Sequence, residues 1–357
     1  MLGIDPRAAR YVWTAAVVVL ALCIVYLLRR TLFIFILALL FAYLLSPLVN
    51  LLDRALPGRT RAPALALSYI IFVGGVVFLA FQIGSRVADQ ATKLEQQFPD
   101  MLTSWEKPSP NAPAVVNSLK AQFVQGIRRE IGMSSNTLFG WVQKAGSKFV
   151  TVASDILYII IIPILGFFFL KDGHAMRDHI LDLIDEGPQR ALFDDLLADI
   201  HLLLAHYMRA LVLLSLAAFT AYSIFFSLVG VPYAVLLAVL GGLFEFIPML
   251  GPLTAALLIV IVGAVAGANV LVMIGFLVAY RVFQDYILSP HLMGQGVELH
   301  PLLVLFGVFA GAEIAGIAGT FLSVPVLALV RIIYIRIRKA RITSRLQPGP
   351  AVIQELP

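Results

Sequence analysis

The chain has 357 residues, of which 60% are hydrophobic and only 13% are charged. A soluble domain has about half of its residues apolar and about a quarter charged. The mean hydropathy of +0.93 excludes an ordinary soluble fold, because the surplus apolar surface would face water at a cost of roughly 25 cal/mol per Å². The formal net charge of +5 fits basic residues that anchor membrane helices at the cytoplasmic face. We expect membrane lipid as a partner and no nucleic acid.

Three stretches near the start of the chain can each span a bilayer. A transmembrane helix needs about 20 mostly apolar residues to cross about 30 Å of hydrocarbon, and 11–28, 31–52 and 63–84 meet this requirement. We assign 1–85 to the first three transmembrane helices. The first is predicted to be retained rather than cleaved as a signal peptide, because it lacks a clear small-x-small cleavage site. Cys23 is the only cysteine, which excludes an intrachain disulfide and a Cys-based zinc site.

Two polar segments interrupt the membrane part. Across 86–149, charged and amide residues recur while apolar residues return at helical spacing, so we predict an extramembrane segment of amphipathic helices. Residues 150–170 form the predicted fourth transmembrane helix. Residues 171–206 combine apolar stripes with aspartates on other faces, and Gly187-Pro188 divides them into two amphipathic acidic helices. Helices that bind membrane surfaces usually carry Lys and Arg, so we expect these to pack against protein.

The last third of the chain differs in kind. Residues 207–340 are predicted to form a C-terminal transmembrane core, in which 234–267 and 301–331 are apolar but interrupted by helix breakers. Three ordinary spans after residue 230 would return the chain to its starting side. A re-entrant hairpin at 234–267, one span and a second hairpin at 301–331 would do the same. The sequence leaves both layouts open. The prediction is an all-α polytopic transmembrane protein with about 8 hydrophobic segments, two of them broken or re-entrant, plus amphipathic extramembrane helices.

Basic residues near the end of the chain indicate its orientation. The positive-inside rule places them, and the tail at 341–357, in the cytoplasm. With the N-terminus on the same side, the helices at 171–206 are cytoplasmic and the 86–149 segment lies outside. The basic cluster consists of Arg331, Arg336, Arg338, Lys339, Arg341 and Arg345.

Glu245 stands inside the first interrupted stretch. An ionisable side chain within a span costs roughly 2.5–3.5 kcal/mol and therefore faces protein or water rather than lipid. Pro248 and Pro252 each remove a backbone donor, and Gly251 allows close approach of another chain segment. Broken helices of this kind build transporter binding sites. The alternative is a Pro-kinked helix whose Glu245 bonds to a neighbour.

A second group of polar residues follows. Arg281 and Asp285 are four residues apart, so they share a helix face and can pair beside Gln284. The pair is predicted to be either an ion pair that breaks during transport or a structural contact in which the two charges neutralise each other between helices. Glu313, in the second interrupted stretch, could mirror Glu245 in a pseudo-repeat. Histidine as a residue type changes charge near neutral pH, so His300 could sense or relay protons, or it could simply contact a helix start.

Several catalytic motifs are absent from the sequence. It contains no Gly-x-x-x-x-Gly-Lys-[Ser/Thr] loop, no Gly-x-Ser-x-Gly elbow and no His-Glu-x-x-His. We therefore predict no enzyme activity, no catalytic residues, no cofactor and no metal ligands. Ion-driven transport or passive flux is what remains for a polytopic chain.

Blocks of the C-terminal third resemble the autoinducer-2 exporter (AI-2E) family of bacterial membrane proteins, also called the PerM-like family. The order of helices and polar segments agrees over nearly the whole chain, although Asp285 stands where the family often has Glu, and Ala210-Leu211 where it commonly has Gly-Gln. The blocks are Phe-Ile-Pro-Met-Leu-Gly-Pro (246–252), Gln284 to Pro290 running into Met293-Gly294, Leu299-His300-Pro301, Gly316-Ile317-Ala318-Gly319 and Val324-Pro325.

The resemblance implies export of a small solute such as the quorum-sensing signal autoinducer-2, from a homo-oligomer in the bacterial inner membrane. For some members it implies Na⁺(Li⁺)/H⁺ antiport, which we keep as an alternative, and a non-transporting membrane scaffold is a second. We expect a transport pathway lined by Glu245, Pro248, Gly251, Pro252, Arg281, Gln284, Asp285, Pro290, His300 and Glu313, with Gly294, Pro301, Gly316, Gly319 and Pro325 as structural motif residues.

Overall fold

The structure, a computed structural model, describes residues 6–56, 60–107, 156–293 and 299–346, with a few positions between 117 and 126. Across these ranges every regular element is helical and no strand occurs. Six of the described helices are long and apolar enough to cross a membrane by length and composition, and two shorter apolar helices accompany them. These findings confirm an all-α, polytopic membrane protein.

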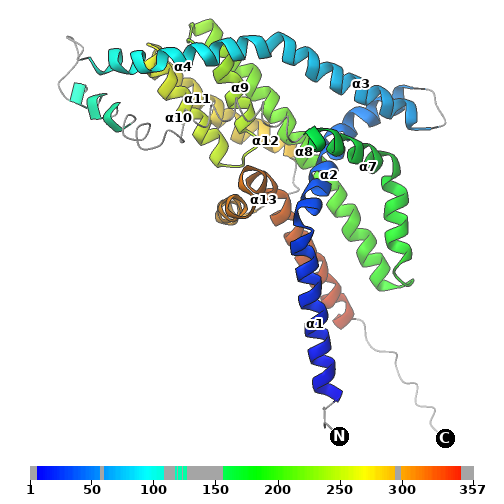
Figure 1. The fold of residues 1–357 in the computed structure, drawn as a ribbon. Coiled ribbons are helices and arrows are strands. Elements are labelled where there is room, and N and C mark those ends of the chain that lie inside the picture. Colours follow the sequence, from blue (N-terminus) through cyan, green and yellow to red (C-terminus); the bar gives the residue numbers. More distant parts are fainter. Residues whose placement is uncertain are drawn as a thin grey trace, which may run out of the picture.

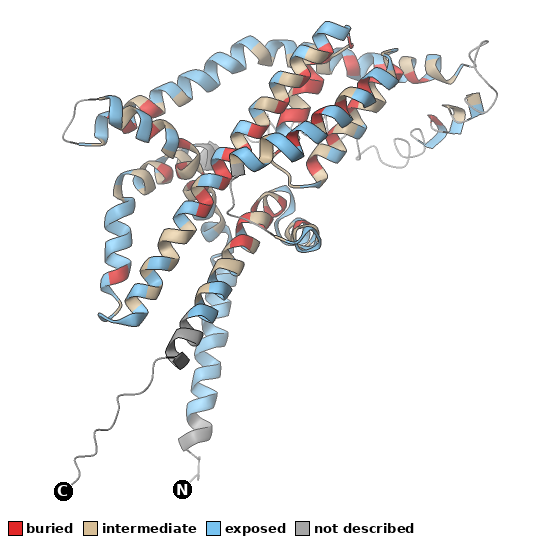
Figure 2. Cartoon of the chain, turned by 180° about the vertical axis from the view of Figure 1, so that it is seen from behind, coloured by how far each residue is buried: buried red, intermediate tan, exposed pale blue. Residues whose placement is uncertain are grey.

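The first helices are arranged around α2. Helix α1 (Pro6–Leu27) is followed almost at once by α2 (Arg29–Ala55), and α3 starts at Ala62 and continues to Leu79. Figure 2 shows α1 exposed along its described length, whereas α2 carries buried residues where it packs against its neighbours. An apolar helix with no protein cover is suited to lipid rather than to water.

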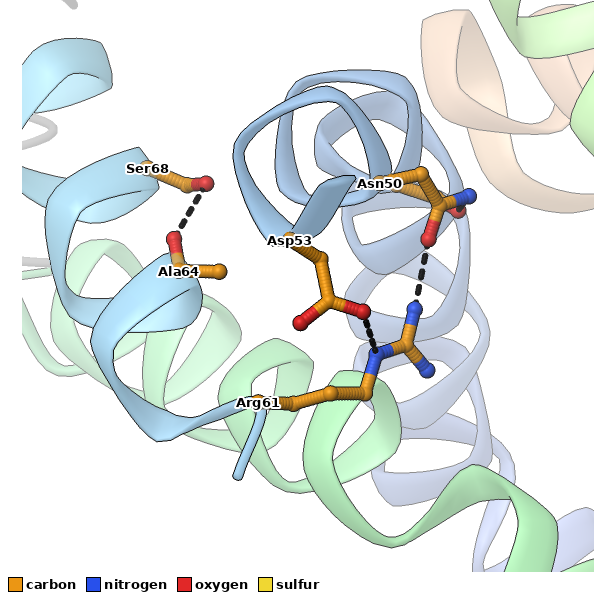
Figure 3. A network of polar contacts seen from close by, with 6 residues as sticks. Asn50, Asp53, Arg61, Ala64 and Ser68 are labelled. Atoms are coloured by element: carbon orange, nitrogen blue, oxygen red, sulfur yellow. Dashed lines mark hydrogen bonds and ion pairs between the residues drawn. The ribbon is translucent and has the colours of Figure 1, made fainter. Parts of the chain in front are cut away.

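Arg61 fixes the start of α3 against the end of α2 (Figure 3). Its guanidinium donates to the Asn50 side-chain oxygen, and its Nε lies 3.4 Å from an Asp53 carboxylate oxygen. Nearby, the buried Ser68 hydroxyl donates to the Ala64 carbonyl at 2.6 Å, so its polar atom is satisfied within its own helix. One basic residue therefore closes the open end of this helix pair.

Helix α3 does not end at the predicted limit of the third span. It continues through a π-helical turn, η1 (Ala80–Gly84), into α4 (Ser85–Glu106), which gives a rod of 45 residues. At 1.5 Å per residue the rod is about 68 Å long, more than twice the thickness of the hydrocarbon. Figure 1 shows it running across one side of the molecule, from the α2–α7 region to α9 and α10. The apolar face of α4 packs there, through Leu94, Phe98 and Leu102.

Helices α7 (Ile156–Asp182) and α8 (Pro188–Val229) form a long hairpin. Arg177 of α7 is paired with Asp194 of α8, and Arg190 with Asp182 at 2.9 Å, so both sides of the turn are tied together. Helix α8 ends at Gly230, whose φ of 72° is the left-handed conformation that glycine adopts readily. The acidic helices and the fourth and fifth predicted spans are thus parts of two continuous helices.

The C-terminal part contains two stretches in which the chain reverses. Helices α9 (Ala234–Phe244) and α10 (Leu250–Val265) pack against each other, joined by a five-residue break. At 1.5 Å per residue they are about 17 and about 24 Å long, short of about 30 Å of hydrocarbon. Helix α13 (Pro301–Leu346) is interrupted at Ala315 and Gly316, and the backbones of Gly311 and Gly319 meet across the kink. Both stretches fold as helical hairpins, which favours the hairpin layout.

Between these hairpins lie α11 (Val270–Phe283), the π-helical turn η3 (Gln284–Leu288) and the short α12 (Ser289–Met293). Figure 2 shows that buried residues gather where α8 packs against α9, α10 and α11. Gly241 and Gly242 permit close contact, because a Cβ at Gly241 would lie 2.3 Å from the Tyr222 ring. The Ser215 hydroxyl also donates to the Gly242 carbonyl at 2.7 Å. This packing holds the first hairpin rigidly against α8.

The first and last described helices extend from the same side of the molecule. In Figure 1, α1, the last part of α13 and the turn between α7 and α8 all project in one direction, and α4 lies at the opposite side. This relative arrangement is the one expected if 171–206 and both termini share a compartment.

Candidate functional site

The break between α9 and α10 is a tight turn with an unusual backbone. The amide of Leu250 donates to the carbonyl of Pro248 at 2.7 Å, which closes a γ-turn around Met249. Met249 has a φ of 60°, a conformation that costs a non-glycine residue of order 1–3 kcal/mol. Gly251, the second residue of α10, lies directly beneath the end of α9, since a Cβ there would lie 1.8 Å from the Phe244 carbonyl oxygen. Proline and glycine together allow this reversal.

Glu245, at the first position of the break, is only 7% exposed. The Gln284 amide nitrogen donates to its carboxylate at 2.7 Å. No basic side chain of the described residues forms an ion pair with Glu245. Gln284 is 3% exposed, and its amide oxygen has no hydrogen-bond partner within the described part of the chain. The two side chains present buried oxygen acceptors, in a setting where an unpaired charge is costly.

Arg281 and Asp285 lie on the same helix as Gln284. The Arg281 Nε donates to the Asp285 carboxylate at 2.8 Å, so the pairing predicted from their spacing is confirmed. Both side chains are about two-fifths exposed, at 43% and 44%. The helix changes to a π-helical turn at Gln284, an irregularity that is frequent at functional sites. Gln284 and Asp285, neighbours in this turn, each provide one member of a polar pair, with Glu245 and with Arg281.

A cavity of about 690 Å³ joins these residues. Its volume lies in the range of about 300–1,000 Å³ that holds small-molecule ligands. Six of the residues predicted for the pathway line it, and they come from the break, the first turn of α10 and the α11–η3 helix: Glu245, Pro248, Pro252, Arg281, Gln284 and Asp285.

Helix α8 supplies a wall of the cavity that the sequence did not indicate. Asp199, His206 and Tyr207 contribute polar groups among leucines, and Val324 and Ile332 of α13 close another side. The Tyr207 side chain is 6% exposed, and its hydroxyl lacks a hydrogen-bond partner among the described residues. The apolar residues at helical spacing along 192–204 predicted that this face of the helix packs against protein. No local pattern, however, identifies which residues of such a face line a cavity.

Four predicted pathway residues do not line the cavity. Gly251 is buried beneath the break, and Pro290 is exposed on α12. His300 is exposed and accepts the Leu302 amide at 3.2 Å, so it caps the start of α13 as the simpler alternative proposed. Glu313 is exposed near the tip of the α13 hairpin and does not mirror the buried Glu245.

The predicted structural motif residues lie in α13, except for Gly294, which is outside the described residues. Pro301 is the first residue of the helix, where a missing amide hydrogen costs nothing. Gly316 has a φ of 59° at the reversal, and Gly319 meets Gly311. Pro325 lies inside the second half of the helix.

Comparison with known proteins gives one family over most of the chain. The model of the family described as "AI-2E family transporter" matches residues 15–339. YueF of Bacillus subtilis (strain 168), named as a transport protein, is 27% identical over 85% of this chain and 84% of its own length. PerM of Escherichia coli (strain K12), named as a permease, is 24% identical over 82% and 84%. The family match includes both hairpins and every residue that lines the cavity, and the chain belongs to the AI-2E transporter family.

Proposed function

We propose that the chain is a secondary transporter that moves a small solute through the cavity beside Glu245. The observation that carries this proposal is the meeting at one place of a broken helix, a ligand-sized cavity and a buried carboxylate that forms no ion pair with the described basic residues. Family membership supports transport as the general activity. Transport also accounts for the absence of enzyme motifs from the sequence.

The cavity wall favours a solute that donates hydrogen bonds. Glu245 and the free Gln284 oxygen are acceptors, and the Tyr207 hydroxyl can donate or accept. Most other lining residues are apolar. A compact molecule with several hydroxyl groups, such as an autoinducer-2-like signal or a related metabolite, satisfies these groups. We infer export, from a homo-oligomer in the bacterial inner membrane with a cytoplasmic C-terminus.

Glu245 is the proposed coupling residue. A buried carboxylate is unfavourable when charged and unpaired, so binding a proton or a small cation would stabilise it. Loss of that ion would restore the charge and change the preferred arrangement of the break. Glu245 would thereby link ion movement to access of the solute. Na⁺(Li⁺)/H⁺ antiport is the second candidate, favoured because the Glu245 and Gln284 oxygens are the ligand type that hard cations prefer.

Ion coupling is testable in proteoliposomes that report internal pH. Under the antiport candidate, an imposed Na⁺ gradient moves protons through the unmodified chain, and Glu245→Gln abolishes the response because a glutamine side chain can carry no proton or charge. Glu313→Gln is the matched control, since Glu313 is exposed and lies outside the cavity. Equal loss in both variants, or none in Glu245→Gln, would contradict the assignment.

A metabolite uptake screen in the same vesicles addresses the solute. Saturable uptake that requires Glu245, without Na⁺-coupled proton movement, would favour solute transport over antiport. If no ion or solute moves while the polar helices still capture a partner, the scaffold alternative stands instead.

A further inference from the structure

The cavity ends at one side against a cluster of charged residues. On α8, the lining residue with the lowest number is Asp199, and on α13 the one with the highest number is Ile332. The two helices share one cluster of buried residues, and α8 begins on the side toward which the last part of α13 projects (Figure 1), so they run antiparallel. Continuing beyond Asp199 and Ile332 therefore leads in one direction, toward the α7–α8 turn and the end of α13.

Arg336 lies one helical turn beyond Ile332 and crosses to α8. Its Nε donates to Asp199 at 2.6 Å, and its Nη1 donates to Asp195 at 2.8 Å. The two aspartates are four residues apart and share one face of α8. Arg336 and Asp199 are partly shielded, with side chains 28% and 34% exposed. A planar guanidinium can engage two carboxylates at once, which a lysine cannot reproduce.

We propose that Arg336, Asp195 and Asp199 form a gate that closes the cavity on the side of the chain termini. This inference rests on the proposed function, because a gate has meaning only if a solute uses the cavity. Breaking the three-residue cluster separates the last part of α13 from α8 and opens the cavity to that side. Asp199 belongs to both the wall and the gate, so a solute that donates a hydrogen bond to Asp199 competes with Arg336 for its carboxylate.

The gate is testable by accessibility, without any transport measurement. Cys23 is the only cysteine in the chain, so Cys23→Ser gives a cysteine-free background. Leu211→Cys then places a thiol at a lining position whose native side chain is 4% exposed. A membrane-impermeant thiol reagent is applied in vesicles that present the termini outward. Labelling is expected to be slow with Arg336 intact and roughly 5- to 30-fold faster in Arg336→Ala, if the gate contributes a typical amount of stability.

Two further variants separate a gate from a loss of folding. Asp199→Arg or Arg336→Asp alone should speed labelling, whereas the double variant should restore the slow rate by reversing the pair. Arg338→Ala is the matched control, because Arg338 is an exposed arginine two positions along the same helix. If Arg336→Ala does not fold, Asp195→Ala removes one of the two bonds and serves in its place.

The outcomes distinguish the gate from the transporter. Unchanged labelling in Arg336→Ala, equal acceleration in Arg338→Ala, or no recovery in the double variant each overturns the gate. Faster labelling together with absent flux of any ion or solute keeps the cavity and its gate but overturns the proposed function. Flux of an ion or solute, together with unchanged labelling in Arg336→Ala, keeps the proposed function but overturns the gate.

Discussion

At the scale of single residues, the site depends on a backbone that few side chains tolerate. Met249 adopts a positive φ, and Gly251 lies against the Phe244 carbonyl. These two positions allow α10 to start beneath α9, and Glu245, in the same break, lines the cavity. Residues held in strained conformations persist only where surrounding packing fixes them, and they concentrate at functional sites.

Gly251→Ala tests this dependence. Its Cβ would meet the Phe244 carbonyl, which belongs to the backbone and cannot rotate away. Overpacking of this kind costs typically 1–3 kcal/mol, so the thermal midpoint of the detergent-solubilised protein should fall. Gly275→Ala is the control, because a Cβ there has no neighbour within 4 Å among the described atoms. A midpoint lowered equally by both variants would show that the contact beneath the break is unimportant.

At the scale of elements, α4 provides hydrogen-bond partners for the start of the α9–α10 hairpin. The Gln90 side-chain oxygen accepts the Leu236 amide at 2.9 Å, in the first turn of α9, where helices leave their amides without partners. Gln97 accepts from the Tyr233 hydroxyl at 2.8 Å, next to the same helix start. Tyr233 provides no side-chain cap to α9, so α4 supplies the cap in its place.

Gln90→Leu should remove this cap while keeping similar side-chain volume. Loss of a helix cap costs about 1 kcal/mol, and the expected result is a lower midpoint together with faster amide exchange at the start of α9. Lys93→Ala provides the comparison, because its bond to Asp89 joins two largely exposed side chains of one helix. Such surface pairs contribute about 0–1 kcal/mol. Unchanged exchange at Leu236 in Gln90→Leu would refute the capping role.

The sequence predicted the break of the first hairpin better than its surroundings. Glu245, Pro248 and Gly251 are local signals, and the i, i+4 spacing of Arg281 and Asp285 predicted a pair that the structure confirms. The contact between Glu245 and Gln284 joins positions 39 residues apart, and no periodicity encodes it. Tyr207 and Arg336 were missed as site residues for the same reason, since their neighbours are set by the packing of α8 against α13.

At the scale of the whole molecule, the membrane character was readable from composition, but element limits were not. Charge density marked 86 and 171 as starts of polar segments, whereas the backbone remains helical through both positions. Helix continuity depends on hydrogen bonds along the chain and not on polarity. In Figure 1, α4 lies opposite the side to which α1 and the last part of α13 project. This agrees with the positive-inside rule about which segments share a side, but it does not say which side is the cytoplasm.

The absolute orientation is a prediction that labelling can decide. In the Cys23→Ser background, single cysteines at Asp100 of α4 and Asp185 of the α7–α8 turn are tested in intact cells with an impermeant reagent. We expect Asp100→Cys to react from outside and Asp185→Cys only after permeabilisation, because the basic C-terminal cluster favours the cytoplasm. The reverse pattern would invert the orientation, and equal reaction at both sites would contradict the opposite sides seen in the fold.

The continuous rod of α3 and α4 has a mechanical consequence. One end of the rod is fastened to α2 through Arg61 and Asn50, and its α4 part holds the start of α9 through Gln90. A helix transmits rotation along its length when its hydrogen bonds remain intact, and the π-helical turn at Ala80–Gly84 provides a single place to flex. A tilt of the N-terminal helices would therefore reach the start of α9, the helix whose other end adjoins Glu245.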